Sequence, residues 1–512
     1  MGNTGAAQEI AAGYATEGAA LELGCVVVDG TVDPSARVRI PFATLNRHGL
    51  VAGATGTGKT KTLQGIAEQL SAAGVPVLLS DVKGDLSGMV RPGEGGPKIE
   101  ERAKETSDDW APTAYPVEFM SLGSGSAAIP IRATLTQFGP ILLSKVLDLN
   151  DTQESTLGLI FHWADRKGLP LLDTKDLRAV VQHLTSDEGK ADLKGIGGVS
   201  PATAGVILRA LVNLEAQGGD DFFGEPELDP ADLMRQVDGK GVVTLLELAD
   251  QQTNPRLWST FLMWLLAELF EELPEAGDLD KPKLVFFLDE AHLLFDGASK
   301  AFLERIEQTV KLIRSKGVGV FFCTQLPTDI PNEVLSQLGA RVQHALRAFT
   351  PEDQAALSKT VRTYPRTAVY DMEQALTSLG IGEAIVTVLS ERGAPTPVAW
   401  SRMRAPRSLM AAIGADAVTE AAKASPLFGK YGETVDRESA YEKLTAKIAA
   451  PAPAPAGAPP PPPAPEPERR LEEPGMVAEV LGSPVVKSFL RSAASALGRE
   501  ITRGLFGTRR RR

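Results

Sequence analysis

The sequence has 512 residues, a hydrophobic fraction of 43% and a formal net charge of −12. This composition supports a large buried core and excludes a chain that is disordered throughout. Its two cysteines and five histidines are scattered, which argues against a disulfide framework or a zinc site and favours a reducing cytoplasm. The N-terminal residues lack the pattern of a signal peptide, and the most apolar stretch, 257–270, is too short to span a bilayer. We therefore expect a cytoplasmic protein that is not an integral membrane protein.

Residues 1–45 precede the first recognisable motif. The alanine- and glycine-rich leader, 1–20, has little periodicity and is expected to be mobile or loosely helical. Short strand-like runs follow at 21–23, 25–28 and 38–40, separated by glycine and proline. They predict a small N-terminal β element that packs before the next domain.

The eight residues Gly53–Thr60 fit the P-loop template G-x-x-x-x-G-K-[ST] at every fixed position. The apolar run 49–52, which precedes the motif, is typical of a buried strand. Residues 60–73, which follow it, have apolar residues at helical spacing. A glycine turn with a surface lysine that matched the template by chance would not need a strand before it and a helix after it. We assign nucleotide binding to Gly53, Ala54, Thr55, Gly56, Thr57, Gly58, Lys59, Thr60 and Lys61.

The residue types of this loop suit the phosphates of ATP. Glycines allow successive backbone N–H groups to point inward at phosphate oxygens, and the N-terminus of the following helix adds partial positive charge. Lys59 supplies a charge for the β- and γ-phosphates, which makes it a catalytic residue, and Thr60 supplies a hydroxyl for Mg²⁺. ATP and Mg²⁺ are therefore the expected cofactors.

Two features follow the P-loop helix. The buried-strand run 75–80 ends in DVKGD, so Asp81 and Asp85 lie where open α/β sheets place their ligands. These carboxylates either order the water shell of the metal, couple to a partner subunit, or cap a polar loop. From 134 to about 235, apolar residues recur at helical spacing over a length far above an ordinary connection, which predicts an inserted helical subdomain.

The stretch KLVFFLDEAHLLF, 283–295, has the form of a Walker B strand. Five apolar residues end in Asp289, which would order Mg²⁺ through water, and Glu290, which would polarise the attacking water. Such a pair can also be the solvated end of a strand, but the P-loop upstream favours the catalytic interpretation.

A third buried strand, 318–323, is followed by Thr324 and Gln325. The amide of Gln325 can hydrogen-bond the γ-phosphate or the attacking water, so we predict a sensor role. Arginines gather on both sides of this segment, at Arg314, Arg341, Arg347, Arg362 and Arg366.

The C-terminal part changes composition twice. Residues 406–449 read as a helical extension, and 450–474 as a proline- and alanine-rich linker that is semi-rigid and has no core. The tail 475–512 has apolar residues at roughly helical spacing; its eight basic and two acidic residues give it +6, so the rest of the chain carries −18. A basic amphipathic tail suits nucleic acid, an anionic membrane surface or docking on a protein, including the acidic body, but a non-specific solvated tail fits as well.

The motifs Gly53–Thr60, Leu284–Glu290 and Thr324-Gln325 together resemble the HerA–FtsK superfamily of P-loop ATPases. More closely, SDVKGDLSG (80–88), FFLDEAHLLF (286–295) and RVQHALRAFTPEDQ (341–354) are similar to the YjgR-type bacterial helicase-like ATPases. The resemblance covers roughly residues 20–440, with three separated motifs in the same order.

This resemblance implies an α/β fold with a RecA-like P-loop NTPase core of the ASCE type, which we place at 46–405. It implies a sensor strand between the two Walker strands, which brings Gln325 beside Glu290 and Lys59. It also implies a homo-oligomeric ring, a hexamer, that acts on DNA. By analogy with ring ATPases, Arg314, Arg341 or Arg347 would be an arginine finger offered to a neighbouring subunit, and we retain Arg314 and Arg347 as catalytic candidates.

Three functions compete. The first is an ATP-hydrolysing motor that assembles as a ring on DNA. The second, a DEAH-box helicase, is suggested by the letters DEAH at 289–292, but it requires a second RecA-like domain that the sequence does not show. The third is a nucleotide-gated scaffold that recruits partners through its linker and tail. Glu290, a catalytic carboxylate, favours hydrolysis over the scaffold.

Overall fold

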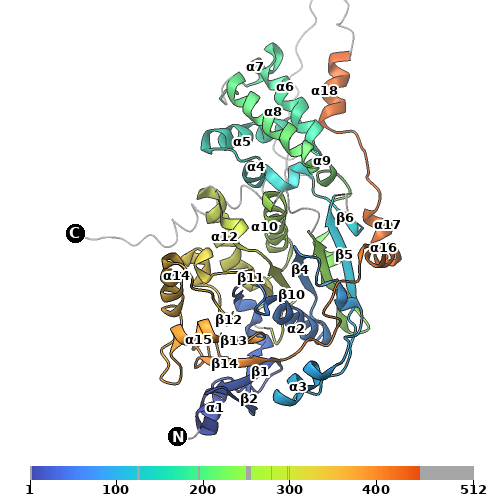
Figure 1. Cartoon of the computed structure of the whole chain (residues 1–512). Coiled ribbons are helices and arrows are strands. Elements are labelled where there is room, and N and C mark those ends of the chain that lie inside the picture. Colours follow the sequence, from blue (N-terminus) through green and yellow to red (C-terminus); the bar gives the residue numbers. More distant parts are fainter. Residues whose placement is uncertain are drawn as a thin grey trace, which may run out of the picture.

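A computed structural model of the protein describes residues 3–123, 127–193, 197–248, 255–277, 279–296, 298, 300–390 and 392–449. Its centre is a twelve-stranded sheet in the order β2-β1-β14-β13-β12-β3-β11-β10-β4-β9-β5-β6 (Figure 1). The predicted linker, 450–474, and the predicted tail, 475–512, lie outside the described residues.

One half of the sheet is parallel. From its inner strand to the edge it contains β12 (Ala340–Gln343), β3 (Gly49–Ala52), β11 (Val318–Thr324), β10 (Leu284–Leu288), β4 (Val77–Asp81), β9 (Val243–Glu247), β5 (Val117–Leu122) and β6 (Ile129–Ile131). Parallel strands are buried on both faces, which explains why these segments read as continuous apolar runs in the sequence. The predicted α/β fold is thereby confirmed.

The other half is antiparallel and contains β13 (Glu383–Thr387), β14 (Ala399–Met403), β1 (Ala20–Val28) and β2 (Thr31–Pro41). The predicted N-terminal strands therefore extend the main sheet, because β1 pairs with β14 from the far end of the core. The leader forms helix α1 (Asn3–Ala12), whose Ala7 and Ile10 are buried against this edge. The expectation of a mobile or loosely helical leader thus changes to a packed helix over these residues.

Alternate residues of the central strands face two different apolar layers. Val285 and Phe287 of β10 belong to the cluster that contains Leu63, Ile66, Ala67 and Leu70 of helix α2 (Lys59–Ala72). Leu284, Phe286 and Leu288 of the same strand belong to the opposite cluster, with α10 (Pro255–Glu272) and α12 (Lys300–Ile313). Helices thus cover both faces of the central strands, as expected for a parallel sheet.

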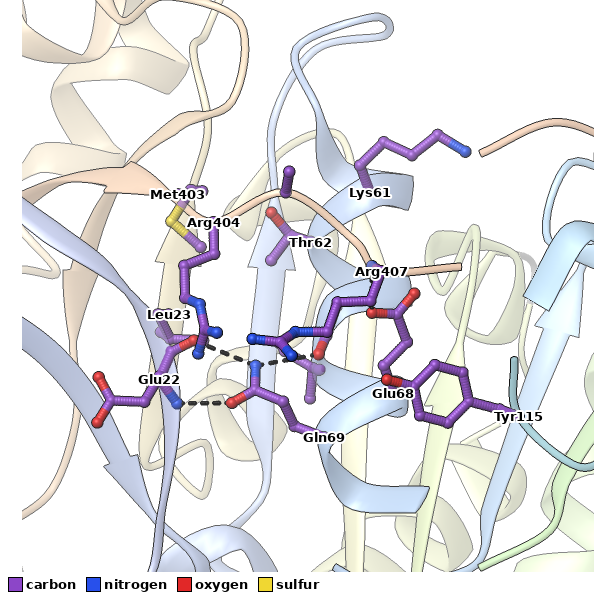
Figure 2. Close-up of a pocket in the computed structure, with 13 residues that line it drawn as sticks. Glu22, Leu23, Lys61, Thr62, Glu68, Gln69, Tyr115, Met403, Arg404 and Arg407 are labelled. Atoms are coloured by element: carbon purple, nitrogen blue, oxygen red, sulfur yellow. Dashed lines mark hydrogen bonds between the residues drawn. The ribbon is translucent and has the colours of Figure 1, made fainter. Parts of the chain in front are cut away.

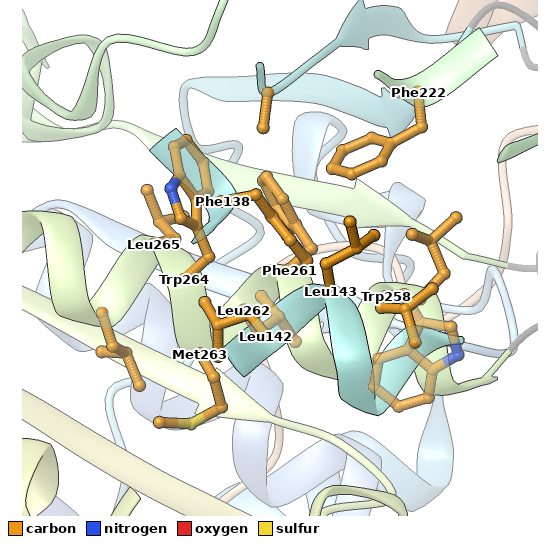
Figure 3. Close-up of a cluster of buried hydrophobic side chains, with 14 of the residues drawn as sticks. Phe138, Leu142, Leu143, Phe222, Trp258, Phe261, Leu262, Met263, Trp264 and Leu265 are labelled. Carbon is orange, nitrogen blue, oxygen red and sulfur yellow. The ribbon is translucent and has the colours of Figure 1, made fainter. Parts of the chain in front are cut away.

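A block of helices lies between β6 and β9 in the sequence, and Figure 1 shows it beyond one edge of the sheet. It contains α4 (Leu135–Val146), α5 (Asp151–Arg166), α6 (Thr174–Thr185), α7 (Asp187–Asp192), α8 (Pro201–Ala216) and α9 (Gly219–Phe222). Its position matches the predicted insertion at 134–235. Figure 3 shows how the block is joined to the core: Phe138 of α4 stacks on Trp264 of α10 at 6.4 Å between ring centroids.

After β14 the chain runs back along the molecule to the helical block. It forms α16 (Ala415–Ala424), α17 (Phe428–Tyr431) and α18 (Ala440–Ala449), which correspond to the predicted helical extension. The start of α18 is fixed on α6, because the buried Asp176 carboxylate accepts hydrogen bonds from the Ser439 hydroxyl (2.5 Å) and the Tyr441 N–H (2.8 Å).

The other helices are α3 (Pro97–Glu105), α11 (His292–Phe295), α13 (Asn332–Leu335), α14 (Pro351–Val361) and α15 (Met372–Ser378). Among the helices of the described ranges, none has the length and apolarity needed to cross a bilayer. The apolar stretch at 257–270 lies in α10, where Leu257, Trp258 and Phe261 are buried in the core.

Candidate functional site

The ends of three neighbouring parallel strands form the site. Strand β11 lies between β3 and β10, with Thr324 opposite Ala52 and Phe322 opposite Leu288. The predicted order, with the sensor strand between the two Walker strands, is therefore confirmed. Carboxyl ends of parallel strands meet at one edge of the sheet, so the P-loop, the Asp-Glu pair and Gln325 all leave from the same edge.

The P-loop is anchored to its neighbours through its backbone. The Gly53 N–H donates to the Thr324 carbonyl (3.2 Å), and the Ala54 N–H donates to the Ala345 carbonyl (2.9 Å). Gly53 has a φ of +148°, and a Cβ there would lie 2.6 Å from the Cβ of His344. Only glycine fits this position, which explains the first fixed letter of the motif in terms of this fold.

His344 is a site residue that the sequence analysis missed. It is fully buried under the P-loop. Its backbone N–H donates to the Ala52 carbonyl (2.7 Å), and its ring Nδ1 bonds the Glu383 carbonyl (2.8 Å). Burial lowers the pKa of the imidazole to about 4, so the ring is neutral, with the proton on Nδ1. Its place in the RVQHALRAF segment was visible in the sequence, but its contact with the loop depends on a strand pairing far along the chain.

Lys59 begins helix α2 and is buried, with 8% of the residue exposed. Its ammonium donates hydrogen bonds to the carbonyls of Gly53 and Ala54, in the concavity of the loop. Burial lowers the pKa of Lys59, and the nearby charge of Lys83 lowers it further. The carboxylates of Glu290 and Asp289 raise the pKa of Lys59 but do not compensate for burial, so the ammonium would be stabilised by a polyphosphate in the loop.

Asp289 and Glu290 follow β10 directly. The Asp289 N–H donates to the Ser80 hydroxyl (2.8 Å), and the Glu290 N–H donates to Asp289 Oδ1 (3.0 Å). Burial, and next the neighbouring Glu290 carboxylate, raise the pKa of Asp289 to about 6. Such a carboxylate is stabilised by a cation, which suits the predicted metal role together with the hydroxyl of Thr60.

Glu290 has a φ of +48°, in the left-handed region that residues other than glycine rarely adopt. Its Oε1 lies 3.7 Å from the Lys83 ammonium, and its Oε2 lies 3.5 Å from Nδ1 of His292. Backbone strain of this kind clusters at functional sites, where the surrounding structure holds it in place. The role of Glu290 as the base stays a prediction, to which the structure adds this backbone strain.

The two carboxylates of the DVKGD segment differ in burial, because Asp81 is buried and Asp85 is half-buried. Asp81 is 1% exposed and accepts hydrogen bonds from the N–H groups of Lys83 (3.2 Å), Gly84 (2.7 Å) and Leu86 (2.9 Å). It therefore caps the turn after β4, which was one of the alternatives left open. Lys83, which the sequence analysis did not single out, is the residue of this segment that faces the Asp-Glu pair.

The predicted sensor Gln325 and the candidate arginines have different surroundings. Gln325 is exposed at the end of β11. The Arg347 guanidinium donates to the Thr55 carbonyl of the P-loop in its own chain (3.3 Å). Arg341 is engaged with the Thr363 carbonyl (2.9 Å).

Arg314 lies just before β11, at the opposite edge of the sheet from the P-loop. A strand of this length spans about 20 Å. Arg314 therefore cannot serve the phosphate site of its own chain, and its candidacy depends on a neighbouring subunit.

The C-terminal segment 403–413 covers the outer side of helix α2. The buried Glu68 carboxylate accepts a hydrogen bond from the Ser408 N–H (2.9 Å) and another from the Ser408 hydroxyl. The Lys61 ammonium donates to the Met410 carbonyl (3.0 Å). The Lys61 side chain thus points at this segment, and the contribution to phosphate binding predicted for this residue would come through its backbone.

A cavity of about 40 Å³ lies between α2, β1 and residues 403–407 (Figure 2). Gln69 closes it toward β1, since its amide accepts from the Glu22 N–H (2.8 Å) and donates to the Glu22 carbonyl (3.1 Å). This volume has room for very few water molecules, because one water occupies roughly 30 Å³ of liquid. The cavity is therefore too small to hold a nucleotide.

Comparison with known proteins agrees with this architecture. The family model "Helicase HerA-like C-terminal" matches residues 28–512. None of the curated proteins matches the chain.

Among solved structures, the bacterial conjugative coupling protein TrwBdeltaN70 in its unbound monoclinic form is similar, with a TM-score of 0.51 at 15% identity over 79% of this chain and 93% of that one. TrwB with the non-hydrolysable ATP analogue ADPNP gives 0.51 at 14% identity, over 78% of this chain and 98% of that one. TrwB with ADP and Mg²⁺ gives 0.50 at 15% identity, over 78% and 94%. At this level of identity the likeness shows the fold.

Proposed function

Because the chain belongs to the family of the HerA-like helicase C-terminal domain, we propose that it is an ATP-hydrolysing motor that assembles as a ring and acts on DNA. The observation that carries the proposal is the meeting of the P-loop and the Asp289–Glu290 pair at one edge of the sheet, with the sensor strand between them. A nucleotide-gated scaffold needs only the loop, whereas a strained carboxylate beside it suits hydrolysis.

ATP and Mg²⁺ are the proposed substrate and metal. The backbone of Gly53–Thr60 would hold the phosphates, and Lys59 would exchange the loop carbonyls for phosphate oxygens. Thr60 and Asp289 would hold the metal, which neutralises charge on the β- and γ-phosphates when it is bound. The TrwB structures with ADP and Mg²⁺ and with an ATP analogue support this choice of ligand.

The chain supplies three further groups. Glu290 accepts the proton of the water that attacks the γ-phosphorus, while the bond to the β–γ bridging oxygen breaks and ADP leaves. Gln325 would orient that water. Arg347 acts on the P-loop of its own chain, and Arg314 would reach the site of a neighbouring subunit in a hexamer.

DNA binding is proposed for the ring as a whole. The acidic body, at −18, repels bulk polyanions, so contact with DNA depends either on basic residues gathered in a central pore or on the basic tail. In the proposed division of the chain, the tail at 475–512 is tethered by the linker at 450–474 to the core at 46–405 and its helical extension at 406–449.

The test is the ATPase rate of the full-length protein with and without duplex or single-stranded DNA. Lys59→Ala should abolish hydrolysis without unfolding the chain, because its side chain bonds only loop carbonyls in the described structure. A protein cut after Ala449 should keep DNA stimulation if the pore carries DNA and lose it if the tail does. A full-length protein that stays monomeric with ATP and ignores DNA would favour the scaffold.

A further inference from the structure

The side chain of Lys83 faces the proposed catalytic carboxylate from the next strand of the sheet. Strand β4 is the direct neighbour of β10, with Leu78 opposite Phe286 and Leu79 opposite Phe287. Both strands end at the same edge, so the turn after β4 lies beside the residues that follow β10. Lys83 Nζ and Glu290 Oε1 are 3.7 Å apart across this boundary.

The backbone around Lys83 is fixed independently of its side chain. The Asp81 carboxylate gathers three backbone N–H groups of the turn, and Gly84 takes a φ of +71° that closes it. The Lys83 side chain is 42% exposed, while that of Glu290 is 18% exposed. A rigid turn thus carries a partly exposed ammonium to a more buried carboxylate, and removing the ammonium leaves the turn intact.

The carboxylate needs such a partner. Asp289 and Glu290 place two negative charges on adjacent residues, and like charges repel strongly where water is excluded. The backbone of Glu290 is already in a strained conformation, so no regular secondary structure fixes the direction of its side chain. At 3.7 Å the contact with Lys83 is longer than a hydrogen bond, and its attraction is mainly electrostatic.

We propose that Lys83 is a positioning residue for Glu290, which holds the carboxylate at the mouth of the P-loop in the direction needed to accept a proton from water. The role rests on the proposed ATPase function and deepens it. In this role Lys83 acts through Glu290, so its loss should lower kcat and leave the KM for ATP unchanged.

The variants Lys83→Met and Lys83→Arg test this assignment. Methionine keeps the length of the side chain without its charge, and kcat should fall about 10-fold, the effect of losing an electrostatic contribution of about 1.4 kcal/mol. Arginine should restore most of kcat because it restores the charge. Lys300→Met is the matched control, since the Lys300 side chain is 90% exposed on α12 and lies 3.9 Å from Glu304. Its kinetics should equal those of the wild type.

A double-mutant cycle separates positioning from direct action. If Lys83 works through Glu290, adding Lys83→Met to Glu290→Gln should cause no further loss of kcat. A multiplied loss, a raised KM with unchanged kcat, or wild-type kinetics in Lys83→Met would each overturn the assignment. Failure of the ATPase proposal itself would look different, because the wild type and the Lys300 control would then not hydrolyse ATP.

Discussion

The Thr62 hydroxyl bonds Nε2 of the buried His344 at 2.9 Å, which ties the first turn of the P-loop helix to the strand beside the loop. Because Nδ1 of the same ring donates to the Glu383 carbonyl, Nε2 is the acceptor and the ring must stay neutral. Protonation would place a second donor against the Thr62 hydroxyl and a charge beneath the loop.

Acid should therefore destabilise the protein. An unfolded histidine takes up a proton near pH 6.5, whereas burial holds the pKa of His344 at about 4. Between these values the unfolded state binds more protons, so stability is lost as pH falls from about 6.5 to 4, by about 2 kcal/mol at pH 5 for this group. The free energy of unfolding at pH 7 and pH 5, from urea titration, measures the loss.

His344→Gln removes this titration, so its loss of stability between pH 7 and pH 5 should be smaller than that of the wild type by about 2 kcal/mol. Carboxyl groups with raised pKa values contribute equally to both proteins and cancel in the comparison. His48, whose pKa burial also lowers to about 4, remains in both. Equal pH dependence in the two proteins would contradict the neutral, buried state of His344.

Glu290→Gln should separate binding from chemistry. The amide keeps the size of the side chain but cannot serve as a base, so ATP should bind while turnover falls roughly 10²–10⁴-fold. Single-turnover hydrolysis together with equilibrium binding of ATP measures the two steps. Normal turnover in this variant would transfer the role of base to another carboxylate, such as Asp85.

The strained backbone at residue 290 predicts an unusual order of stability. A φ of +48° costs an L-residue about 1 kcal/mol or more but costs glycine little, so Glu290→Gly should be at least as stable as Glu290→Ala. Glu304 in helix α12 is the matched control, because glycine in a helix interior is about 1 kcal/mol less stable than alanine. The free energies of unfolding of the four variants, measured in urea, check this reversed order of stability. If alanine were more stable than glycine at both positions, the result would be evidence against strain at residue 290.

Arg347 and Arg314 should differ in how their effects depend on assembly. Arg347 contacts the P-loop of its own chain, so Arg347→Ala should weaken ATP binding even where the protein is dilute and monomeric. Arg314→Ala should lower turnover only at protein concentrations that support a ring, because Arg314 lies at the other edge of its own sheet. ATPase rates across a dilution series, with the mass measured at each point, distinguish the two. If the ATPase rates of the two variants depended on protein concentration in the same way, Arg314 would not be the arginine finger.

Local pattern was enough to place the candidate site residues at the ends of strands. Each of the three strands is a buried apolar run followed directly by its polar residues, so composition alone places the P-loop, Asp289 and Gln325 at strand ends. The order of those strands came from the family resemblance, and the structure agrees with it. What pattern could not supply is the set of partners that only tertiary contact creates.

Three contacts show why the sequence pattern could not predict such partners. His344 reaches the P-loop because β12 pairs with β3, and Lys83 reaches Glu290 because β4 lies beside β10. Both residues lie in motifs that carry the family resemblance, 80–88 and 341–354, but the local pattern does not show which residues they contact. Similarly, the sequence predicted β1 and β2 as a separate β element, because β14, which pairs with β1, lies at the other end of the core in the sequence.

The pairing of β1 with β14 has a consequence for synthesis on the ribosome. Gly24 is opposite Met403, so β1 emerges almost a whole core ahead of its neighbour, by tens of seconds at about 5–20 residues per second. During that interval one side of the β1–β2 hairpin has unpaired backbone groups, which can pair with a strand of another nascent chain. Aggregation during synthesis should therefore increase with the length of this interval.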